Sequence, residues 1–285
     1  MNSVPNNFIE DLLLRICATE GSIGLNRLAK VFRRHVRRIA EKGSIRCLVL
    51  FDGRFGRFGQ YSCAAESFAP LSTKLCPKYC TSKWVLYCTE QDATSVPQID
   101  PNLPAMLEKY VKEPGMLSLQ LYSPLLNSNW IKLFSSWKGL NQVDVAVAFN
   151  IHVFQLLENL LDQKQLVKLL VSRNNYGIRG MNLFCKFLEQ KQFSCLVFDK
   201  CGNSSDRIWN NPKKANFAGS SVHWPCKLDF HDPSLEALGR ADKCSVQFRR
   251  KNMIVSYIWT SATKSTPDDK IIRSCSKTVV HFVNE

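Results

Sequence analysis

Apolar residues recur four times in the middle of the chain, in the order apolar-x-x-apolar-x-apolar. The copies are Met116/Leu119/Leu121, Leu140/Val143/Val145, Leu166/Leu169/Val171 and Phe193/Leu196/Phe198. Apolar residues two positions apart predict short strands with one buried face. Consecutive copies start 24, 26 and 27 residues apart, a period typical of repeat proteins in which each unit holds one strand and one helix. Because a single unit cannot bury its apolar face alone, we expect the units to stack.

Each of the four predicted strands follows a stretch whose apolar residues have helical spacing. These stretches cover residues 103–111, 130–137, 153–161 and 181–188. The third and fourth copies reach Asn174 and Cys201, where a side chain can satisfy backbone groups at the end of the strand, whereas the first two have Pro124 and Ala148 there. Motif and period together resemble leucine-rich repeats. We favour this interpretation over four unrelated βα units of an ordinary α/β domain.

Other segments predict strands outside the repeats. Residues 45–51 form a short apolar run that predicts a strand, and residues 244–248 with 253–259 predict a hairpin. Residues 278–283 predict a last strand. We expect these C-terminal strands to pair with the end of the repeat sheet, because a terminal cap must cover its open edge.

Three polar or glycine-rich segments predict irregular structure. Residues 202–222 and 260–274 are polar and predict loops. Residues 52–59 read Asp-Gly-Arg-Phe-Gly-Arg-Phe-Gly, with glycine at every third position. Interleaved Arg and Phe side chains are of the kind that contacts nucleic acid, but a flexible turn between two elements is the favoured interpretation of this segment.

The composition is that of a globular protein, with 45% hydrophobic and 22% charged residues. No apolar run is long enough to span a bilayer, so we expect no membrane partner. Glu10 and Asp11 near the N-terminus argue against a secretory signal. We therefore expect the twelve cysteines to be reduced thiols in a cytoplasmic or nuclear protein.

The formal net charge of +14 favours acidic partners. Residues 1–60 contain eleven Lys or Arg against five Asp or Glu, and five of the basic residues gather on one side of a predicted helix over 25–39: Lys30, Arg33, Arg34, Arg37 and Arg38. Such a face is suited to phosphates. The helices, strand 45–51 and the Gly/Arg turn after it also resemble a winged helix, so a nucleic-acid-binding protein is the alternative function.

The sequence contains no convincing catalytic constellation. Gly-x-Ser-x-Gly, His-Glu-x-x-His and a Walker loop are absent from it. The five histidines have no spaced acid or nucleophile, so we interpret them as surface or packing residues and expect neither an enzyme nor a cofactor. Two groups have zinc-ligand chemistry, and for both we favour a site without metal: Cys63, Cys76, Cys80 and Cys88, and His223, Cys226 and His231.

The N-terminal segment resembles an F-box, which begins with an apolar-Pro pair and an apolar helix. The resemblance rests on Val4, Pro5, Phe8, Ile9, Leu12, Leu13 and Ile16, with Leu25, Leu28, Ala29, Val31 and Phe32 in the following helices. The whole layout looks like the large, divergent F-box families of nematodes, in which a target-binding domain follows the F-box. This resemblance implies docking on the adaptor Skp1 of a cullin ubiquitin ligase through Val4, Pro5, Phe8, Ile9, Leu12, Leu13, Ile16 and Phe32.

We therefore predict an α/β protein (α+β overall) in three parts. These are an F-box-like helical module at 3–50, a connecting segment at 51–104, and an irregular leucine-rich-repeat-like domain with a C-terminal β cap at 105–285. Side chains alternate along a strand, so the buried positions identify the outward ones. We expect an unknown target protein to bind Gln120, Tyr122, Gln142, Asp144, Lys168, Leu170, Val197 and Asp199.

Overall fold

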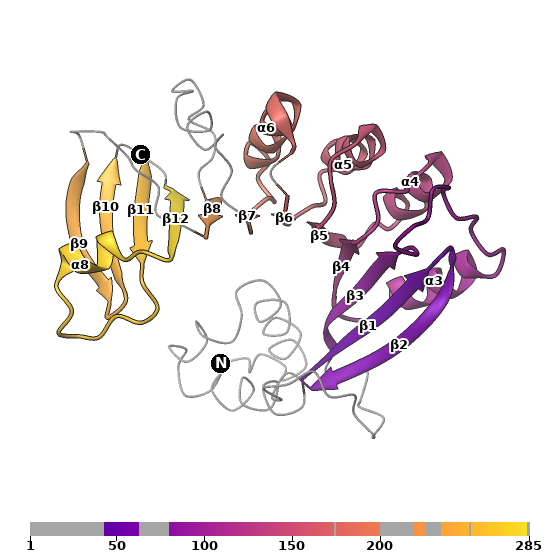
Figure 1. The fold of residues 1–285 in the computed structure, drawn as a ribbon, viewed down its shortest axis with the longest axis horizontal. Helices are drawn as coiled ribbons and strands as arrows, with labels where there is room; N and C mark the ends of the chain where they lie inside the picture. Colours follow the sequence, from indigo (N-terminus) through magenta and orange to yellow (C-terminus); the bar gives the residue numbers. More distant parts are fainter. Residues whose placement is uncertain are drawn as a thin grey trace, which may run out of the picture. The chain divides into compact units, whose positions relative to one another are not determined.

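The computed structural model describes residues 43–62, 80–173, 175–199, 219–225, 235–250 and 252–283. Strands and helices alternate along much of this part of the chain (Figure 1). The chain divides into two compact units, Met1–Gln142 and Val143–Glu285, which we call unit 1 and unit 2. The expected combination of helices and strands in an α/β fold is confirmed.

Unit 1 contains strands in the order β2-β1-β3-β4. Its described elements are β1 (Ser44–Phe51), β2 (Arg54–Ser62), β3 (Cys80–Cys88), α3 (Leu103–Lys112), β4 (Met116–Leu121) and α4 (Ser128–Ser135). β2 pairs with β1 in antiparallel orientation, whereas the β1–β3 and β3–β4 pairs are parallel. β3 lies in the range predicted as a connecting segment, and it pairs with both β1 and β4.

The core of unit 1 lies between one face of these strands and the two helices. Leu48 of β1 pairs with Val85 of β3, which pairs with Leu119 of β4, and all three side chains are almost completely buried. The Tyr87 ring contacts Trp130 of α4 at a centroid distance of 4.7 Å. The predicted helices 103–111 and 130–137 are confirmed as α3 and α4, because their apolar stripes are the sides that they bury.

A lysine is buried in this core. Lys83 of β3 is 1% exposed, and its Nζ donates hydrogen bonds to the backbone oxygens of Tyr110 (3.1 Å), Val111 (2.7 Å) and Glu113. These carbonyls lie at the C-terminal end of α3, where backbone oxygens lack their usual partners in the next turn, and that of Tyr110 also accepts the backbone N–H of Glu113 at 3.3 Å. The ammonium group therefore donates hydrogen bonds to the carbonyls at the C-terminus of α3, and its positive charge interacts favourably with the helix dipole. Burial lowers the pKa of Lys83 to about 8.

The prediction of a flexible turn at residues 52–59 is wrong for most of that segment. Residues 54–62 form strand β2, and the turn between β1 and β2 consists of Asp52 and Gly53. Their φ angles are 47° and 80°. Two consecutive residues with positive φ match the tight turn that suits the twist of a hairpin, and Asp-Gly is a preferred sequence for it. The Gly-Arg-Phe repeat is thus part of a strand.

Unit 2 contains strands in the order β6-β7-β8-β12-β11-β10-β9. Its elements are α5 (Ile151–Gln163), β6 (Lys168–Val171), α6 (Gly177–Leu188), β7 (Cys195–Phe198), β8 (Ser221–Trp224), β9 (Glu236–Asp242), β10 (Ser245–Arg250), β11 (Met253–Ile258), α8 (Asp268–Arg273) and β12 (Lys277–Phe282). The β6–β7 and β7–β8 pairs are parallel, and the pairs from β8 to β9 are antiparallel. Strand β5 (Leu140–Val145) crosses the boundary between the two units in the sequence.

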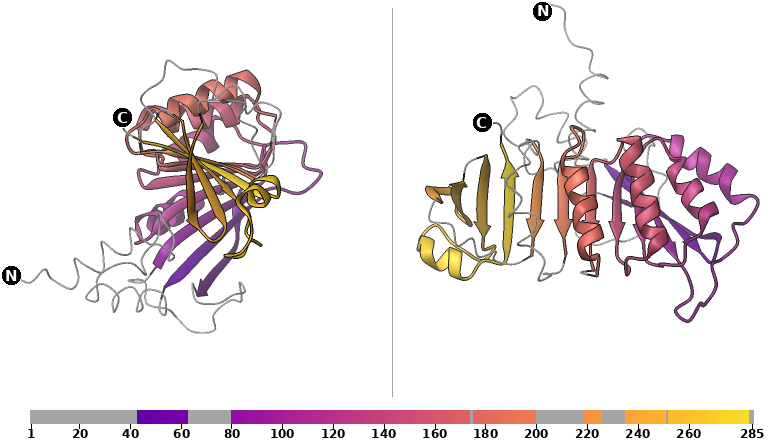
Figure 2. Two further views of the ribbon diagram at one scale, coloured as in Figure 1. Left: turned by 90° about the vertical axis from the view of Figure 1, so that its left-hand side faces the viewer. Right: turned by 90° about the horizontal axis from the view of Figure 1, so that it is seen from above.

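The core of unit 2 lies under α5 and α6, which stand side by side on one side of β6 and β7 (Figure 2). The ring of Phe184 on α6 contacts Tyr176 and Phe198 at centroid distances of 5.1 and 5.8 Å, and Phe198 stacks on Trp224 at 5.3 Å. The Asn150 side chain caps α5. The predicted helices 153–161 and 181–188 are confirmed as α5 and α6.

The strands expected at the C-terminus are also confirmed. β10 and β11 form the predicted hairpin, and β12 is the predicted last strand. β12 pairs with β8, which in turn pairs with the last repeat strand, β7, so the C-terminal strands join the repeat strands through β8 and not directly as predicted. The two predicted loops are wrong in part, because β8 begins at the end of the first and the short helix α8 lies within the second. Tertiary contacts stabilise both elements: Val222 and Ile271 are fully buried.

All four copies of the apolar repeat form strands, namely β4, β5, β6 and β7. The three apolar positions of each copy are buried except Met116, which is half-buried. Asn174 and Cys201 lie outside the described residues. Within the described part of the chain, none of the helices combines the length and the apolar composition needed to cross a membrane.

Candidate functional site

The face of the unit 2 strands that points away from the core carries basic, acidic, hydroxyl, thiol and imidazole side chains. Leu169, Leu196 and Val222 are buried on the core face. The positions between them form a row in register, in which Lys168 of β6 pairs with Cys195 of β7, and Cys195 pairs with Ser221 of β8. Six residues of β6, β7, β8 and β12 form what we call the polar cluster: Lys168, Cys195, Ser221, His223, Lys277 and His281.

A serine and a histidine lie at the centre of the polar cluster. The Oγ of Ser221 is 3.0 Å from Nε2 of His223, and it also donates to the backbone oxygen of Ser194 at 3.2 Å. The His223 ring meets the His281 ring edge to face at a centroid distance of 6.5 Å. Ser221 and His223 are two positions apart on β8, so the period of the strand places both on the same face.

The polar cluster has a positive electrostatic environment. Burial, together with the charges of Lys277, His281 and Lys168, lowers the pKa of His223 to about 3. Burial and Lys277 also lower the pKa of His281. No ion pair joins Lys168 or Lys277 to an acid among the described residues. Both ammonium groups are therefore available to an anionic ligand.

Two acidic residues lie beside the polar cluster: Asp144 on β5, and Asp199, which follows β7. Ser172 Oγ donates to Oδ1 of Asp144 at 3.4 Å. Burial raises the pKa of Asp144, the nearby charge of Asp199 raises it further, and the bond from Ser172 and the charge of Lys168 oppose this shift. The face thus changes from acidic to basic between Asp144 and Lys277.

Five residues predicted to bind a target lie on this side of unit 2: Asp144, Lys168, Leu170, Val197 and Asp199. Asp199 is exposed, and the other four are half-buried. Gln120, Tyr122 and Gln142 belong to unit 1. Among these three, Tyr122 is 51% exposed, and its hydroxyl is 3.4 Å from Oε1 of Gln120.

The other predicted binding residues lie outside the described part of the chain. They are the adaptor face, Val4, Pro5, Phe8, Ile9, Leu12, Leu13, Ile16 and Phe32, and the basic face, Lys30, Arg33, Arg34, Arg37 and Arg38. The winged-helix alternative treats the strand at 45–51 and the turn after it as parts of a small basic domain. In the structure this strand, β1, lies between β2 and β3 and is parallel to β3, which does not favour that alternative.

Sequence reasoning missed most of the polar cluster. Ser221 and His223 lie in or beside a predicted loop, and Lys277 and His281 flank or occupy the predicted last strand without a role. The alternation Ser221-x-His223, with Val222 and Trp224 buried, is the signal that indicates a strand with a polar face. Four residues are too few to distinguish this pattern from a polar loop without knowledge of the neighbouring strands.

The polar cluster lacks the arrangement of a nucleophilic catalyst. A serine–histidine pair needs a third group that orients the histidine, and none of the hydrogen bonds among described residues joins a carboxylate to His223. Burial raises the pKa of the Cys195 thiol, which disfavours the reactive thiolate. These groups are suited to binding a ligand by hydrogen bonds and charge.

The cysteine positions exclude the four-cysteine zinc site considered from the sequence. Cys80 and Cys88 are the first and last residues of β3. A nine-residue strand separates its ends by about 26 Å, whereas two sulfurs on one zinc each lie about 2.3 Å from the metal. Cys63, Cys76, Cys226 and His231 lie outside the described residues. Within the described residues, no group of three or more His, Cys, Asp or Glu has a metal-binding arrangement.

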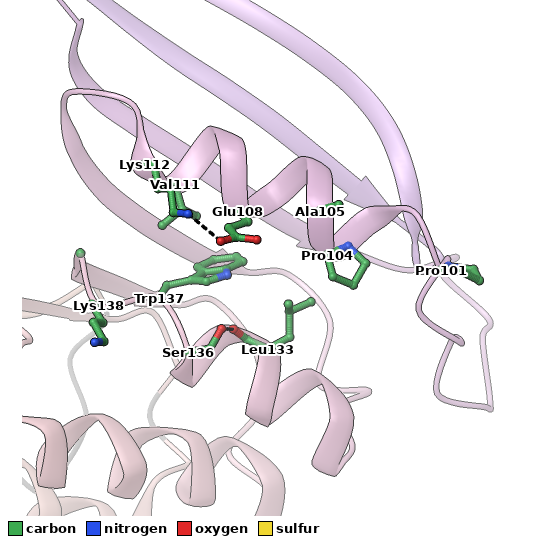
Figure 3. A pocket seen from close by; sticks show the side chains of 11 residues that line it. Pro101, Pro104, Ala105, Glu108, Val111, Lys112, Leu133, Ser136, Trp137 and Lys138 are labelled. Carbon is green, nitrogen blue, oxygen red and sulfur yellow. Dashed lines mark hydrogen bonds and ion pairs between the residues drawn. The ribbon is translucent and has the colours of Figure 1, made fainter.

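Unit 1 has a groove of about 860 Å³ between α3 and α4 (Figure 3). Pro104, Val111, Leu133 and Trp137 are among the side chains that line it. On its rim, the Nζ of Lys112 lies 2.6 Å from Oε1 of its helix neighbour Glu108. The groove is mainly apolar, and its acid and base neutralise each other, so it offers less recognition chemistry than the polar cluster.

Acidification is expected to destabilise the protein partly through His223. The pKa of His223 is about 3 in the folded protein and about 6.5 in an unfolded chain, so the unfolded chain binds the proton between these values. The stabilising contribution is complete above pH 6.5 and is lost as the pH falls toward 3. Urea unfolding at pH 7 and pH 5 should show that His223→Gln reduces the pH-dependent loss by about 2 kcal/mol. An equal loss in both proteins would contradict this assignment.

The structure therefore presents two candidate recognition surfaces, the polar cluster of unit 2 and the apolar groove of unit 1. The polar cluster has the larger variety of donors, acceptors and charges. Comparison of the chain with protein-family models, with curated proteins and with solved structures finds no match, so its function is inferred from the chemistry of these side chains.

Proposed function

We propose that this protein is a non-enzymatic substrate receptor of a Skp1–cullin–F-box ubiquitin ligase. In this proposal the open face of unit 2 binds a target protein, and the N-terminal module binds the adaptor. The observation that carries the target-binding role is the polar cluster together with its acidic neighbours, because successive strands bring unpaired cations, carboxylates and hydrogen-bonding groups onto one face.

The mixed chemistry of this face suits a protein partner. Leu170 and Val197 pair in register beside the polar cluster, and both are half-buried. Apolar side chains flanked by charges are typical of protein interfaces, which are about as apolar as the rest of the surface. Lys168 and Lys277 would pair with acidic groups of the target, while Asp144 and Asp199 would favour a neighbouring basic group. The target is thus a segment whose charge changes sign along its length.

The adaptor-binding role is supported by the sequence of residues 3–50. Its apolar-Pro pair and apolar stripe resemble an F-box, and such residues would be buried against Skp1. Burying one leucine side chain contributes about 1.5–3 kcal/mol, so a charged residue at Leu12 would remove most of the contact. A receptor of this kind acts in the cytoplasm or the nucleus.

Two variants test the two binding roles separately. Lys168→Glu combined with Asp144→Lys preserves the net charge and reverses the local pattern, so co-purification from cells should lose the target and retain Skp1. Leu12→Asp should lose Skp1 and retain the target. Both can be read by mass spectrometry of the proteins that co-purify with a tagged full-length chain.

A matched control changes the same charges on the helical side of unit 2. Asp162 and Lys186 are exposed residues of α5 and α6, so Asp162→Lys combined with Lys186→Glu should leave both partners bound. Absence of Skp1 from the wild-type sample would reject the ligase role. If the variant with Lys168→Glu and Asp144→Lys still co-purifies with all the proteins other than Skp1 that the wild type binds, this face is not the target site.

A further inference from the structure

The hairpin of β1 and β2 displays an unusual density of exposed aromatic rings. Phe51, Phe55 and Phe58 are 43%, 46% and 46% exposed. Among the described strands, β2 pairs with β1 alone, so it is an edge strand of unit 1. Exposed phenylalanines gathered on an edge indicate a surface that binds something.

A bulge places two of these rings on the same side of the strand. Phe55 pairs with Leu50 and Phe58 pairs with Leu48, while Gly56 is the additional residue between them. Three residues of β2 therefore span two of β1, which separates the two rings by about 7 Å along the strand. Without the bulge, residues three positions apart would lie on opposite faces.

The same bulge places two arginines together on the other side. Arg54 pairs with Phe51 and Arg57 pairs with Val49, so both guanidinium groups and the Phe51 ring share one face. Neither arginine forms a hydrogen bond or an ion pair with a described residue. The two strands contain no acidic residue, and the carboxylate of Asp52 in the turn accepts the backbone N–H of Glu90 at 3.1 Å. The cations are therefore available for a ligand.

We propose that this edge, formed by Phe51, Arg54, Phe55, Arg57 and Phe58, binds single-stranded nucleic acid. An arginine followed by a phenylalanine occurs twice in β2, at Arg54-Phe55 and Arg57-Phe58. Each such pair supplies one cation and one ring, and each nucleotide carries one phosphate and one planar base. Bases stack on the side of Phe55 and Phe58, and phosphates pair with Arg54 and Arg57 across the edge. Stacking accepts every base, so we expect weak sequence preference.

A nucleic acid fits the edge better than an added peptide strand does. An added strand needs a regular ladder of backbone groups, and the bulge at Gly56 interrupts that ladder. Charged residues on an edge also oppose strand addition. A nucleic acid needs rings and cations and no backbone ladder. The residues of this site are different from those of the proposed target face of unit 2 and from the basic residues at 30–38, and the site does not depend on the proposed ligase role.

Fluorescence anisotropy with labelled oligouridine and oligothymidine tests the proposal on the full-length protein. Arg54→Ala combined with Arg57→Ala should weaken binding roughly 10-fold or more and reduce the slope of log K against log salt by about 1.4, because each phosphate contact contributes about 0.7 for a single strand. Phe55→Leu should weaken binding roughly 5-fold or more with an unchanged salt slope.

A matched control removes two cations elsewhere. Lys132 and Lys186 are exposed on α4 and α6, and Lys132→Ala combined with Lys186→Ala changes the net charge by the same amount. This control should retain the wild-type affinity within about 2-fold. Thermal unfolding should show that all variants remain folded, and Phe55→Leu is chosen because Phe58 also contacts the Tyr110 ring at 6.3 Å.

Four outcomes would overturn the proposal. The first is an equal loss in the control and the arginine variant, which indicates attraction by overall charge. The second is wild-type affinity for Phe55→Leu. The third is loss of binding only when Arg33, Arg34, Arg37 and Arg38 are replaced by alanine, which places the site in the N-terminal segment. The fourth is binding of an extended peptide of alternating glutamate and valine in place of either oligonucleotide.

Discussion

Replacing Lys83 with methionine is expected to lower the free energy of unfolding by about 3 kcal/mol. Methionine keeps most of the aliphatic volume of lysine but has no donor. The backbone oxygens of Tyr110, Val111 and Glu113 would lose the ammonium group that binds them. A buried acceptor without a partner costs about 1–3 kcal/mol, and the end of α3 would also lose its favourable charge.

Urea unfolding at neutral pH measures this effect. Lys112→Met is the matched control, because Lys112 is exposed on the last turn of α3 and its ion pair with Glu108 lies in solvent. An exposed pair contributes at most about 1 kcal/mol. A loss of stability in the Lys83 variant no larger than that of the control would show that the α3 carbonyls do not need the buried lysine.

Replacing Phe184 with alanine is expected to lower the free energy of unfolding by about 4 kcal/mol. Phe184 is completely buried, and its ring contacts Phe149, Tyr176 and Phe198. Truncation loses the transfer free energy of the ring and leaves a cavity between α6 and β7 that its aromatic neighbours fill only in part. Phe184→Leu should cost less, since it leaves a smaller cavity.

Thermal and urea unfolding of these variants should be compared with Ile178→Ala. Ile178 lies on the same helix, α6, but is 62% exposed, so its truncation should change the stability by less than about 0.5 kcal/mol. If Phe184→Ala and Ile178→Ala destabilise the protein equally, α6 does not pack on β7 through Phe184.

Local patterns in the sequence were sufficient where each element buries its own apolar stripe. The four repeat copies predict β4 to β7 because alternation places Leu119, Val143, Leu169 and Leu196 on the buried side. The helices α3 to α6 follow from apolar residues one turn apart, and Asn127 and Asn150 cap α4 and α5. These signals are short-range, so they can be recognised without knowledge of the neighbours.

Elements without such a pattern could not be recognised from their own sequence, because the strands and helices next to them hold them in place. β2 has arginine, phenylalanine and glycine on a strand that is exposed on both sides, and pairing with β1 holds it in place. β8 has four residues and is held between β7 and β12. The six residues of α8 place Ile271 in a small core with Val246 and Ala262. A chain segment that obtains its stability from another segment carries little local evidence of its structure.

In the candidate site, too, some features follow from local sequence patterns and others from the pairing of distant strands. Alternation along the repeat strands is sufficient to identify Asp144, Lys168 and Asp199 as outward residues. Their association with Ser221, His223, Lys277 and His281 required the register of β6, β7, β8 and β12. Lys168 and His281, which are 113 positions apart in the sequence, share one face because strand pairing joins distant segments. That pairing is a long-range property.

The sequence by itself determined the type and order of most elements, the buried side of each repeat strand and the excess positive charge. Only the tertiary structure decided that a buried lysine ends α3, that a bulge aligns the rings and the arginines of β2, and that two histidines meet beside two lysines. The physical reason is that hydrophobic periodicity acts within one element, whereas the environment of a charge depends on every element packed around it.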